Sequence, residues 1–318
     1  MLISCGCPVA GVWADPLSLP GFAMRAEELG YHGLWSFQRL LVGADQDLAP
    51  VYRSVLDPML ALTYAAARTT AIRLGVAVIN LPYLSPAYLA KQASTLDVLS
   101  GGRFDLGLGT GWSPVEFAAT GSHPSPRGRR IEEYLAVLRT LFTDRVAAYE
   151  GSLYTLPPST MDPPPVQPGG PPILLGGTAE AAMRRAGRIA AGWVSSSRAS
   201  LADIQRGAQV VRRAAEEAGR DPDTVRIVVR GVVQAGPARR RGAAVRQLGA
   251  DPGQCPAVRR GRRHRAVLRP QLGSTDRLPG RRPEGGRRPG RGDPHRAGAR
   301  LEAVQGDADR GRVAVVHQ

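Results

Sequence analysis

Short apolar runs alternate with amphipathic stretches through the first 234 residues of the chain, and this alternation limits the possible folds more than any other feature. A short apolar run predicts a buried strand, whereas apolar residues spaced three or four positions apart predict a helix. Strands and helices that alternate in this way form βα units, in which the strands pair in parallel. We therefore expect an α/β fold in which a parallel sheet closes into a barrel.

Seven strands and six helices follow from this reading. The predicted strands span residues 2–7, 34–37, 72–81, 104–108, 173–175, 193–196 and 225–233, and the predicted helices span residues 22–29, 58–68, 85–99, 130–142, 179–191 and a stretch that ends at Gly219. The proline-rich segment 155–172 suits neither a helix nor a central strand, so we expect a surface connection there. No eighth strand is found in the sequence.

The composition changes abruptly near residue 234. The net charge of +15 is unevenly placed, because residues 1–234 carry 22 basic and 20 acidic side chains whereas residues 235–318 carry 20 and 7. Every Phe, Tyr and Trp lies in the first part, and the second part is rich in Arg, Gly and Pro. The sequence therefore predicts a barrel domain over residues 1–234 and a basic, disordered tail of low complexity over residues 235–318.

Several classes of protein are disfavoured by the residues present. Three cysteines with no C-x-x-C pair fit a reducing compartment. The chain has no basic leader with a long apolar stretch and no apolar run of membrane-spanning length, so a cytoplasmic protein without a membrane segment is expected. His32 and His123, the histidines that precede the tail, belong to no hydrolase or metalloprotease motif, and no metal site is predicted.

Five separated segments resemble, in order and spacing, the luciferase-like oxidoreductase superfamily. They read RAEELGYHGLW, SVLDPMLALTYAAARTTAIRLGVAV, SPAYLAKQASTLDVLSGGRFDLGLGTGW, YEGSLYTLPP and PPILLGGTAEAAMRRAGRIAAGW, and are most similar to the actinobacterial class that uses coenzyme F420. The resemblance implies a TIM (β/α)₈-type barrel with the cofactor across the carboxyl ends of the strands. It also implies hydride transfer between F420 and a small organic substrate. FMN-dependent monooxygenation is the alternative.

Glycines after the fourth predicted strand are candidates for the floor of this cofactor site. Backbone amides near glycine can approach a flat ring or a phosphate closely, and the candidate residues are Gly107, Gly109, Thr110 and Gly111. The alternative for this segment is an ordinary tight turn. Asn80 ends the third strand, where relatives carry a bulge behind the cofactor ring, and its amide could address a polar ring edge; a simple turn residue is the alternative.

Two further segments are candidates for binding the cofactor phosphate. Gly176, Gly177 and Thr178 lie between a strand and a helix, so their amides would point from a helix N-terminus. Thr178 could add its hydroxyl group or cap the helix. Ser196, Ser197 and Arg198 follow the sixth strand, and Arg198 could pair with the phosphate or lie exposed in a loop.

The candidate catalytic positions differ from those of many relatives. Where relatives carry an Asp-His pair after the second strand, this chain has Gln38 and Arg39. Arg39 cannot act as a general base, although it could orient an anionic substrate or a reduced ring. Trp112 replaces a Glu found in sugar-phosphate-oxidising relatives, and either stacks on the cofactor or packs in the core.

The tail allows two interpretations. It could be an arm that binds nucleic acid, but it lacks lysine and interleaved aromatic residues, so nucleic-acid binding is not favoured. Alternatively, codons can be chosen for residues 245–272 that read, one base later, as CGSWEQIRDNAQRYAAAGVTELFFDLNS, which resembles the closing helix and eighth strand of the family. We therefore hypothesise a frameshift between about residues 233 and 245, which would replace the last strand and helix of the barrel and leave an inactive copy or an incomplete barrel. The expected partners are a small-molecule substrate and, because relatives often dimerise, a second copy of the chain.

Overall fold

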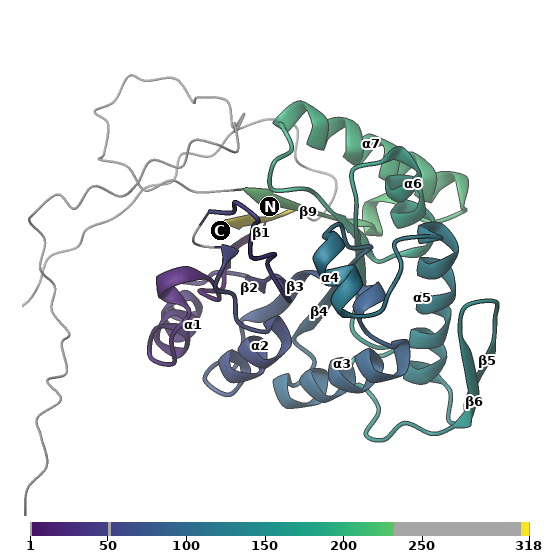
Figure 1. Ribbon diagram of the computed structural model, residues 1–318, viewed down its shortest axis with the longest axis horizontal. Coiled ribbons are helices and arrows are strands. Elements are labelled where there is room, and N and C mark those ends of the chain that lie inside the picture. Colours follow the sequence, from purple (N-terminus) through teal and green to yellow (C-terminus); the bar gives the residue numbers. More distant parts are fainter. Residues whose placement is uncertain (1, 50–51, 232–312, 318) are drawn as a thin grey trace, which may run out of the picture. The chain divides into compact units, whose positions relative to one another are not determined.

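Eight parallel strands close into a barrel in a computed structural model that describes residues 2–49, 52–231 and 313–317 (Figure 1). Their order around the barrel is β1-β10-β9-β8-β7-β4-β3-β2. The strands are β1 (Leu2–Gly6), β2 (Gly33–Ser36), β3 (Arg73–Asn80), β4 (Phe104–Gly109), β7 (Ile173–Gly176), β8 (Gly192–Val194), β9 (Arg226–Gly231) and β10 (Val313–His317). The predicted TIM-type barrel is confirmed.

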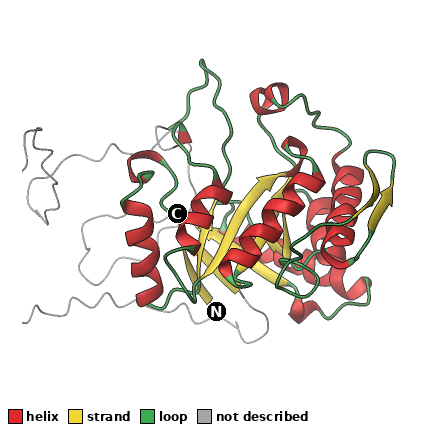
Figure 2. Cartoon of the chain, turned by 90° about the horizontal axis from the view of Figure 1, so that it is seen from below, coloured by secondary structure: helices red, strands yellow, loops and turns green. Residues whose placement is uncertain are grey.

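Helices pack around the strands, as Figure 2 shows with helices in red and strands in yellow. They are α1 (Ser18–Glu28), α2 (Pro58–Ala66), α3 (Pro86–Ser100), α4 (Pro114–Ala119), α5 (Arg127–Thr143), α6 (Glu180–Ile189) and α7 (Leu201–Glu217), with short 3-10 turns η1 (Gly11–Trp13), η3 (Leu81–Tyr83) and η4 (Pro222–Thr224). No helix of the described ranges has both the length and the apolar character to cross a membrane.

The starts of α2 and α3 are set by side-chain caps followed by proline. Asp57 Oδ1 accepts hydrogen bonds from two amides of the first turn of α2, and Ser85 Oγ accepts one at the start of α3. Proline follows each cap, where its missing N–H costs nothing. Helix α3 ends at Gly101, whose φ of 65° lies in the left-handed region that glycine adopts readily.

A tryptophan fills the middle of the barrel. Trp35 packs against apolar side chains from four other strands, Ala77, Leu174, Val194 and Val228, which can meet only inside the closed sheet. A Cβ atom on Gly75 would lie 2.5 Å from the Trp35 ring, so glycine is needed there. The larger part of the core lies between the strands and the outer helices.

Charged residues close the amino end of the barrel. Asp105 is buried, and its Oδ1 accepts hydrogen bonds from Arg73 Nη2 at 2.7 Å and from Arg226 Nη2 at 3.0 Å. Burial would raise the pKa of Asp105, but the two guanidinium groups hold it below its ordinary value. Since this end is filled, a ligand can enter the barrel only at the carboxyl ends of the strands.

The seven predicted strands correspond to β1, β2, β3, β4, β7, β8 and β9. The proline-rich connection begins with a strand that the sequence did not predict: β6 (Thr155–Ser159) pairs antiparallel with β5 (Ala147–Glu150) in a separate hairpin. Glu133 holds this hairpin by accepting hydrogen bonds from Ser152 Oγ and Leu153 N.

The eighth position of the barrel is also occupied, although the sequence indicated no strand for it. β10 pairs in parallel with β1 and with β9, so neither of these strands has the open edge expected of an incomplete barrel. The rest of the predicted tail, including the segment of the frameshift hypothesis, lies outside the described residues.

Candidate functional site

A cavity of about 700 Å³ opens at the carboxyl ends of the strands. Its lining comes from the ends of β2, β3, β4, β7, β8 and β9 and from the loops that follow them. Twelve of the thirteen candidate site residues lie in this lining: Gln38, Arg39, Asn80, Gly109, Thr110, Gly111, Trp112, Gly176, Gly177, Thr178, Ser196 and Arg198. The fold therefore brings together residues that are up to 160 positions apart in the sequence.

Gly107 is the candidate that the cavity does not include. It lies deeper in β4, where a Cβ atom would come within 2.1 Å of the carbonyl oxygen of Val76 on β3. The pairing of β3 with β4 shifts register just beyond this point, between Val76 and Ile79. Gly107 thus permits two strands to approach each other at the bulge, and a role in cofactor binding stays a prediction.

The floor of the cavity is a hydrogen-bonded unit built on Asn80. The side-chain Oδ1 of Asn80 accepts a hydrogen bond from the backbone N–H of Gly111 at 3.1 Å, and the backbone N–H of Asn80 donates to Gln38 Oε1 at 2.8 Å. Glycine is required at Gly109 and Gly111, because Cβ atoms there would lie 2.5 Å from Val78 and 2.7 Å from the Tyr83 hydroxyl. Since the Asn80 oxygen is engaged, its side-chain NH₂ is the group left to address a ligand.

Arg39 is held at the cavity wall by two partners. Its Nη1 lies 3.5 Å from Glu116 Oε2, and its guanidinium carbon lies 4.7 Å from the centre of the Trp112 ring. Glu116 is buried in α4, and its other oxygen accepts from the amides of Leu40 at 2.7 Å and Leu41 at 3.3 Å. The loop after β2 is therefore fixed by one carboxylate that the sequence analysis did not single out.

Tyr83 lies behind this unit, with its ring 5.3 Å from that of Phe117 in an edge-to-face contact. Burial, and then the neighbouring charge of Glu116, raise the pKa of Tyr83 to about 12. The hydroxyl group therefore keeps its proton at neutral pH.

The N-termini of two helices, α5 and α6, also contribute to the cavity lining. Helix α6 starts after Ala179 and α5 starts after Pro126, and neither has a side-chain cap, so Thr178 does not cap α6 as one reading of the sequence allowed. Gly177 has a φ of 148°, and a Cβ atom there would lie 2.6 Å from Ala182. The first amides of both helices remain available for an anion.

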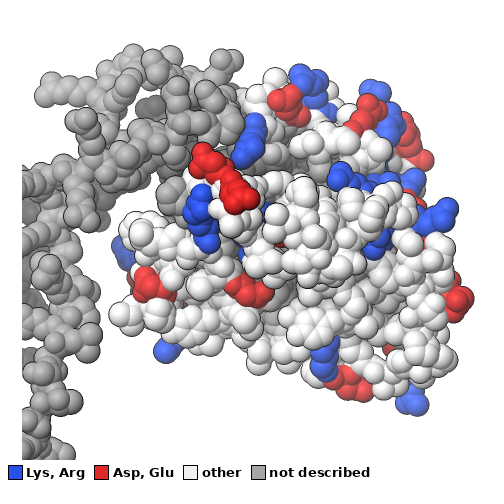
Figure 3. All heavy atoms as spheres, viewed as in Figure 1, with Lys and Arg blue, Asp and Glu red and all other residues white. Residues whose placement is uncertain are grey.

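Arginine is the main charged residue of the cavity. Arg39, Arg127, Arg185, Arg198 and Arg230 line it, whereas Asp, Glu, His and Lys are absent from the lining that the described residues form. Figure 3 shows several basic side chains on the face that carries α6. Sequence reasoning missed Arg127, Arg185 and Arg230, although Arg230 follows the rule that site residues occupy the carboxyl ends of barrel strands. Burial lowers the pKa of Arg230.

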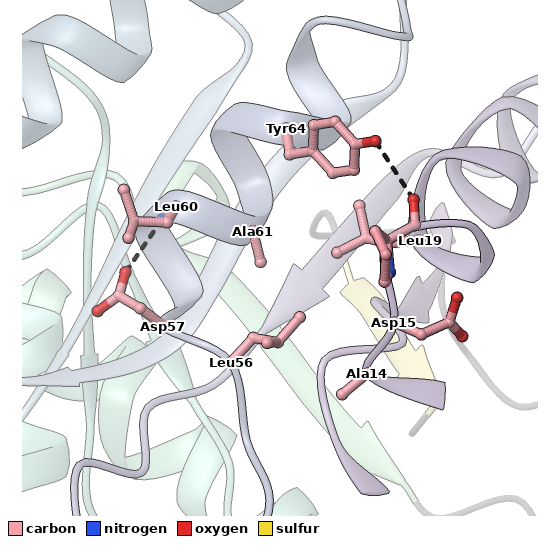
Figure 4. A pocket seen from close by; sticks show the side chains of 9 residues that line it. Ala14, Asp15, Leu19, Leu56, Asp57, Leu60, Ala61 and Tyr64 are labelled. Carbon is pink, nitrogen blue, oxygen red and sulfur yellow. Dashed lines mark hydrogen bonds between the residues drawn. The ribbon is translucent and has the colours of Figure 1, made fainter. Parts of the chain in front are cut away.

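A second cavity, of about 310 Å³, lies between the loop before α1 and helix α2 (Figure 4). Two carboxylates line it, but both are engaged by backbone amides: Asp15 Oδ1 accepts from Leu17 N and Ser18 N just before and at the start of α1, and Asp57 Oδ1 caps α2 by accepting from Met59 N and Leu60 N. Its other lining residues are mostly apolar, so it offers no catalytic group. Across the described part of the chain, no cluster of His, Cys, Asp or Glu side chains could hold a metal ion.

Comparisons with known proteins match the chain to one family. The family described as luciferase-like monooxygenase matches residues 11–309. An uncharacterized protein of Mycobacterium bovis is 40% identical over 152 residues, which are 48% of this chain and 51% of that protein. The F420-dependent glucose-6-phosphate dehydrogenase of Kineococcus radiotolerans is 30% identical over 186 residues, or 57% and 53% of the two chains. The chain thus spans about half the length of these curated relatives.

Solved structures agree with the fold. Monooxygenase RslO1 from Streptomyces bottropensis superposes with a TM-score of 0.62 and 25% identity, over 72% of this chain and 70% of that one. The oxygenating constituent of 3,6-diketocamphane monooxygenase from Pseudomonas putida, in complex with FMN, superposes with a TM-score of 0.58 and 21% identity, over 72% and 66%. Proteins similar to this chain thus include one named for F420 and one that binds FMN.

Proposed function

The chain belongs to the luciferase-like monooxygenase family, a family of flavin- or F420-dependent oxidoreductases, and on this premise we propose that it transfers hydride from reduced coenzyme F420 to a small organic acceptor. One observation carries the choice of F420: five arginines and no acidic side chain line the described cavity. F420 carries a phosphate and an acidic tail, and so more negative charge than FMN.

The residues present fit a cofactor of this shape. Gly109, Gly111 and Asn80 all line the cavity, and the two glycines carry no side chain that could obstruct a flat ring. The uncapped N-termini of α5 and α6 suit a phosphate group. Arg185 lies close to the first turn of α5, since a Cβ atom on Gly128 would be 2.7 Å from Arg185 Nη2.

The missing acid–base groups favour reduction over alcohol oxidation. Oxidation of an alcohol requires a group that accepts the hydroxyl proton, and His or a carboxylate usually fills that role. None lines the described cavity, and Arg39 occupies the position where relatives carry a histidine. When bound, reduced F420 would supply the hydride. Arg39 and Asn80 would orient the acceptor and the ring, while Trp112 limits access of water.

Cofactor retention tests this proposal. The full chain is incubated separately with F420 and with FMN, passed through a desalting column, and examined for bound cofactor by visible absorbance. We expect F420 to be retained and FMN to be lost. Reduced F420 should then be oxidised in the presence of an activated alkene or carbonyl compound. Retention of FMN alone would contradict the proposal.

FMN-dependent monooxygenation is the second candidate. It is supported by the likeness to RslO1 and to the FMN-bound structure, and by the apolar residues beside Arg39, which would keep water from a reactive oxygen species. Oxygen consumption with reduced FMN, together with an oxygenated product, would favour it over hydride transfer to an organic acceptor.

Other expectations from the sequence stay predictions. A homodimer is expected, and gel filtration with light scattering would measure it. Nucleic-acid binding by the tail is not favoured. Salt-dependent retention of the full chain on DNA would reverse that expectation, because phosphate contacts weaken as salt increases.

A further inference from the structure

We propose that the substrate is an apolar carboxylate, whose carboxylate group binds Arg39 and whose apolar body lies against the rim formed by Leu40, Leu41, Trp112 and Val115. This inference rests on the proposed function, because it names the substrate that would meet the cofactor in the same cavity. Four features of the described residues carry it.

The first feature is the unused hydrogen-bonding capacity of Arg39. A guanidinium group has five N–H donors. The interactions of Arg39 are one contact of 3.5 Å to Glu116 and the stacking on Trp112, so most of its donors are not engaged. The side chain is only 12% exposed, and it lines the cavity. A buried cation with free donors favours an anionic oxygen ligand.

The second feature is that Glu116 holds Arg39 without satisfying it. One Glu116 oxygen accepts from the amides of Leu40 and Leu41, and the other makes the long contact to Arg39. The carboxylate therefore fixes the loop and orients the guanidinium group, which makes Glu116 a positioning residue. The planar fork of Arg39 can then offer two parallel N–H groups to a carboxylate.

The third feature is the apolar rim. Leu40, Leu41, Trp112 and Val115 are large apolar side chains that remain 48%, 44%, 55% and 39% exposed. Trp112 lines the cavity itself, whereas Leu40 and Leu41 directly follow Arg39 in the loop after β2 and Val115 lies in the first turn of α4. The loop after β2 and α4 approach closely, since a Cβ atom on Gly43 would lie 3.2 Å from Val115. An apolar body placed here would remove this surface from water.

The fourth feature is the separation of the arginines into two groups. Arg127 is the first residue of α5, Arg185 reaches the first turn of α5 from the middle of α6, and Arg198 follows β8, so these three suit the phosphate of the cofactor. Arg230 interacts with Tyr52, whose ring contacts Phe37 two positions before Arg39. Arg39 itself is paired with the carboxylate of Glu116. This balance suits one negative charge better than the two of a phosphate monoester.

Binding of a matched series of probes tests the inference. The full chain loaded with F420 is titrated calorimetrically with 3-phenylpropanoate, with its methyl ester and with 2-phenylethyl phosphate. We expect the carboxylate to bind at least about tenfold more tightly than the ester, because the ester cannot form a charge-assisted pair. Arg39→Met should bring the two affinities within about twofold of each other. Arg39→Lys keeps the charge without the planar fork and should retain part of the preference.

A matched control uses an arginine outside the cavity. Arg188→Met, on α6, should leave the ratio of carboxylate to ester affinity unchanged. Equal binding of carboxylate and ester to the wild type, tighter binding of the phosphate, or a preference that survives in Arg39→Met would each overturn the inference. Retention of F420 is measured for the wild type and each variant before any probe is added. If no cofactor is retained but the carboxylate preference still depends on Arg39, the proposed function fails and the substrate inference stands.

Discussion

Arg39 and Glu116 lie 77 positions apart in the sequence, yet the Nη1 atom of one is 3.5 Å from the Oε2 atom of the other at the wall of the cavity. The carboxylate is almost wholly buried, and it also accepts the amides of Leu40 and Leu41. The pair therefore connects α4 to the loop that follows β2.

Removal of this carboxylate should destabilise the protein. Glu116→Ala leaves a largely buried guanidinium without its anion and two amides without an acceptor, so the free energy of unfolding should fall by about 3 kcal/mol. Glu116→Gln keeps an oxygen for the amides and should cost about 1 kcal/mol. Urea denaturation of both variants measures the difference. Equal stability of the alanine variant and the wild type would contradict this account of the loop.

Gly75 should not tolerate a side chain. Gly75→Ala places a methyl group 2.5 Å from the Trp35 ring at the centre of the barrel, and overpacking of this kind lowers the free energy of unfolding by about 1–3 kcal/mol. The matched control is Gly21→Ala in α1, where no atom lies within 4 Å and the higher helix propensity of alanine should add about 0.5–1 kcal/mol. Thermal unfolding of the two variants should shift in opposite directions.

Asp105 should make stability dependent on pH in the acid range. Its pKa in the folded protein lies below the ordinary value of 3.8, so its contribution is complete above that value and is lost as pH falls through the lower folded pKa. At neutral pH we expect Asp105→Asn to cost about 3 kcal/mol. The difference in unfolding free energy between wild type and variant should shrink below about pH 4. A constant difference would mean that Arg73 and Arg226 do not stabilise the ionised form.

Arg185 should contribute to cofactor affinity. Arg185→Gln removes a cation beside the first turn of α5 and should raise the dissociation constant of F420 about tenfold. Arg188→Gln changes the same helix outside the cavity and should have little effect. Fluorescence titration of the cofactor distinguishes them, and equal weakening by both variants would indicate a general effect of charge on α6.

The coding DNA tests the frameshift hypothesis. We expect the codons for residues 245–272, read one base later, to encode the helix and strand that resemble the end of the family barrel. Any other product in that frame would refute the hypothesis. Restoring that frame should then produce a chain in which aromatic residues continue beyond residue 234.

The strands and the cavity could largely be predicted from the sequence, for a physical reason. Parallel strands need continuous apolar runs, and site residues must follow their carboxyl ends, so the positions of Asn80, Gly109 and Gly176 follow from the strand pattern. Gly107 could not be separated from these residues, because a glycine that lets two strands approach looks the same in a sequence as a glycine that binds a ring.

Other features depended on long-range packing. Glu116 contacts Arg39 only because α4 folds against the loop after β2, and nothing near Glu116 in the sequence signals this. The apolar run of β10, Val313 to Val316, is only four residues long and follows a long stretch without periodicity, so local pattern could not distinguish it from chance.

The absence of His, Asp, Glu, Lys and Cys from the described cavity lining has a consequence for kinetics. Enzymes that rely on such groups show a bell-shaped dependence of rate on pH, and its inflections report the pKa values of protein side chains. The ionisable side chains in this lining are those of arginine and tyrosine, residue types whose reference pKa values lie at about 10 or above. An inflection in turnover near pH 6 or 7 would therefore report an ionisation of the bound molecule and could serve to identify it.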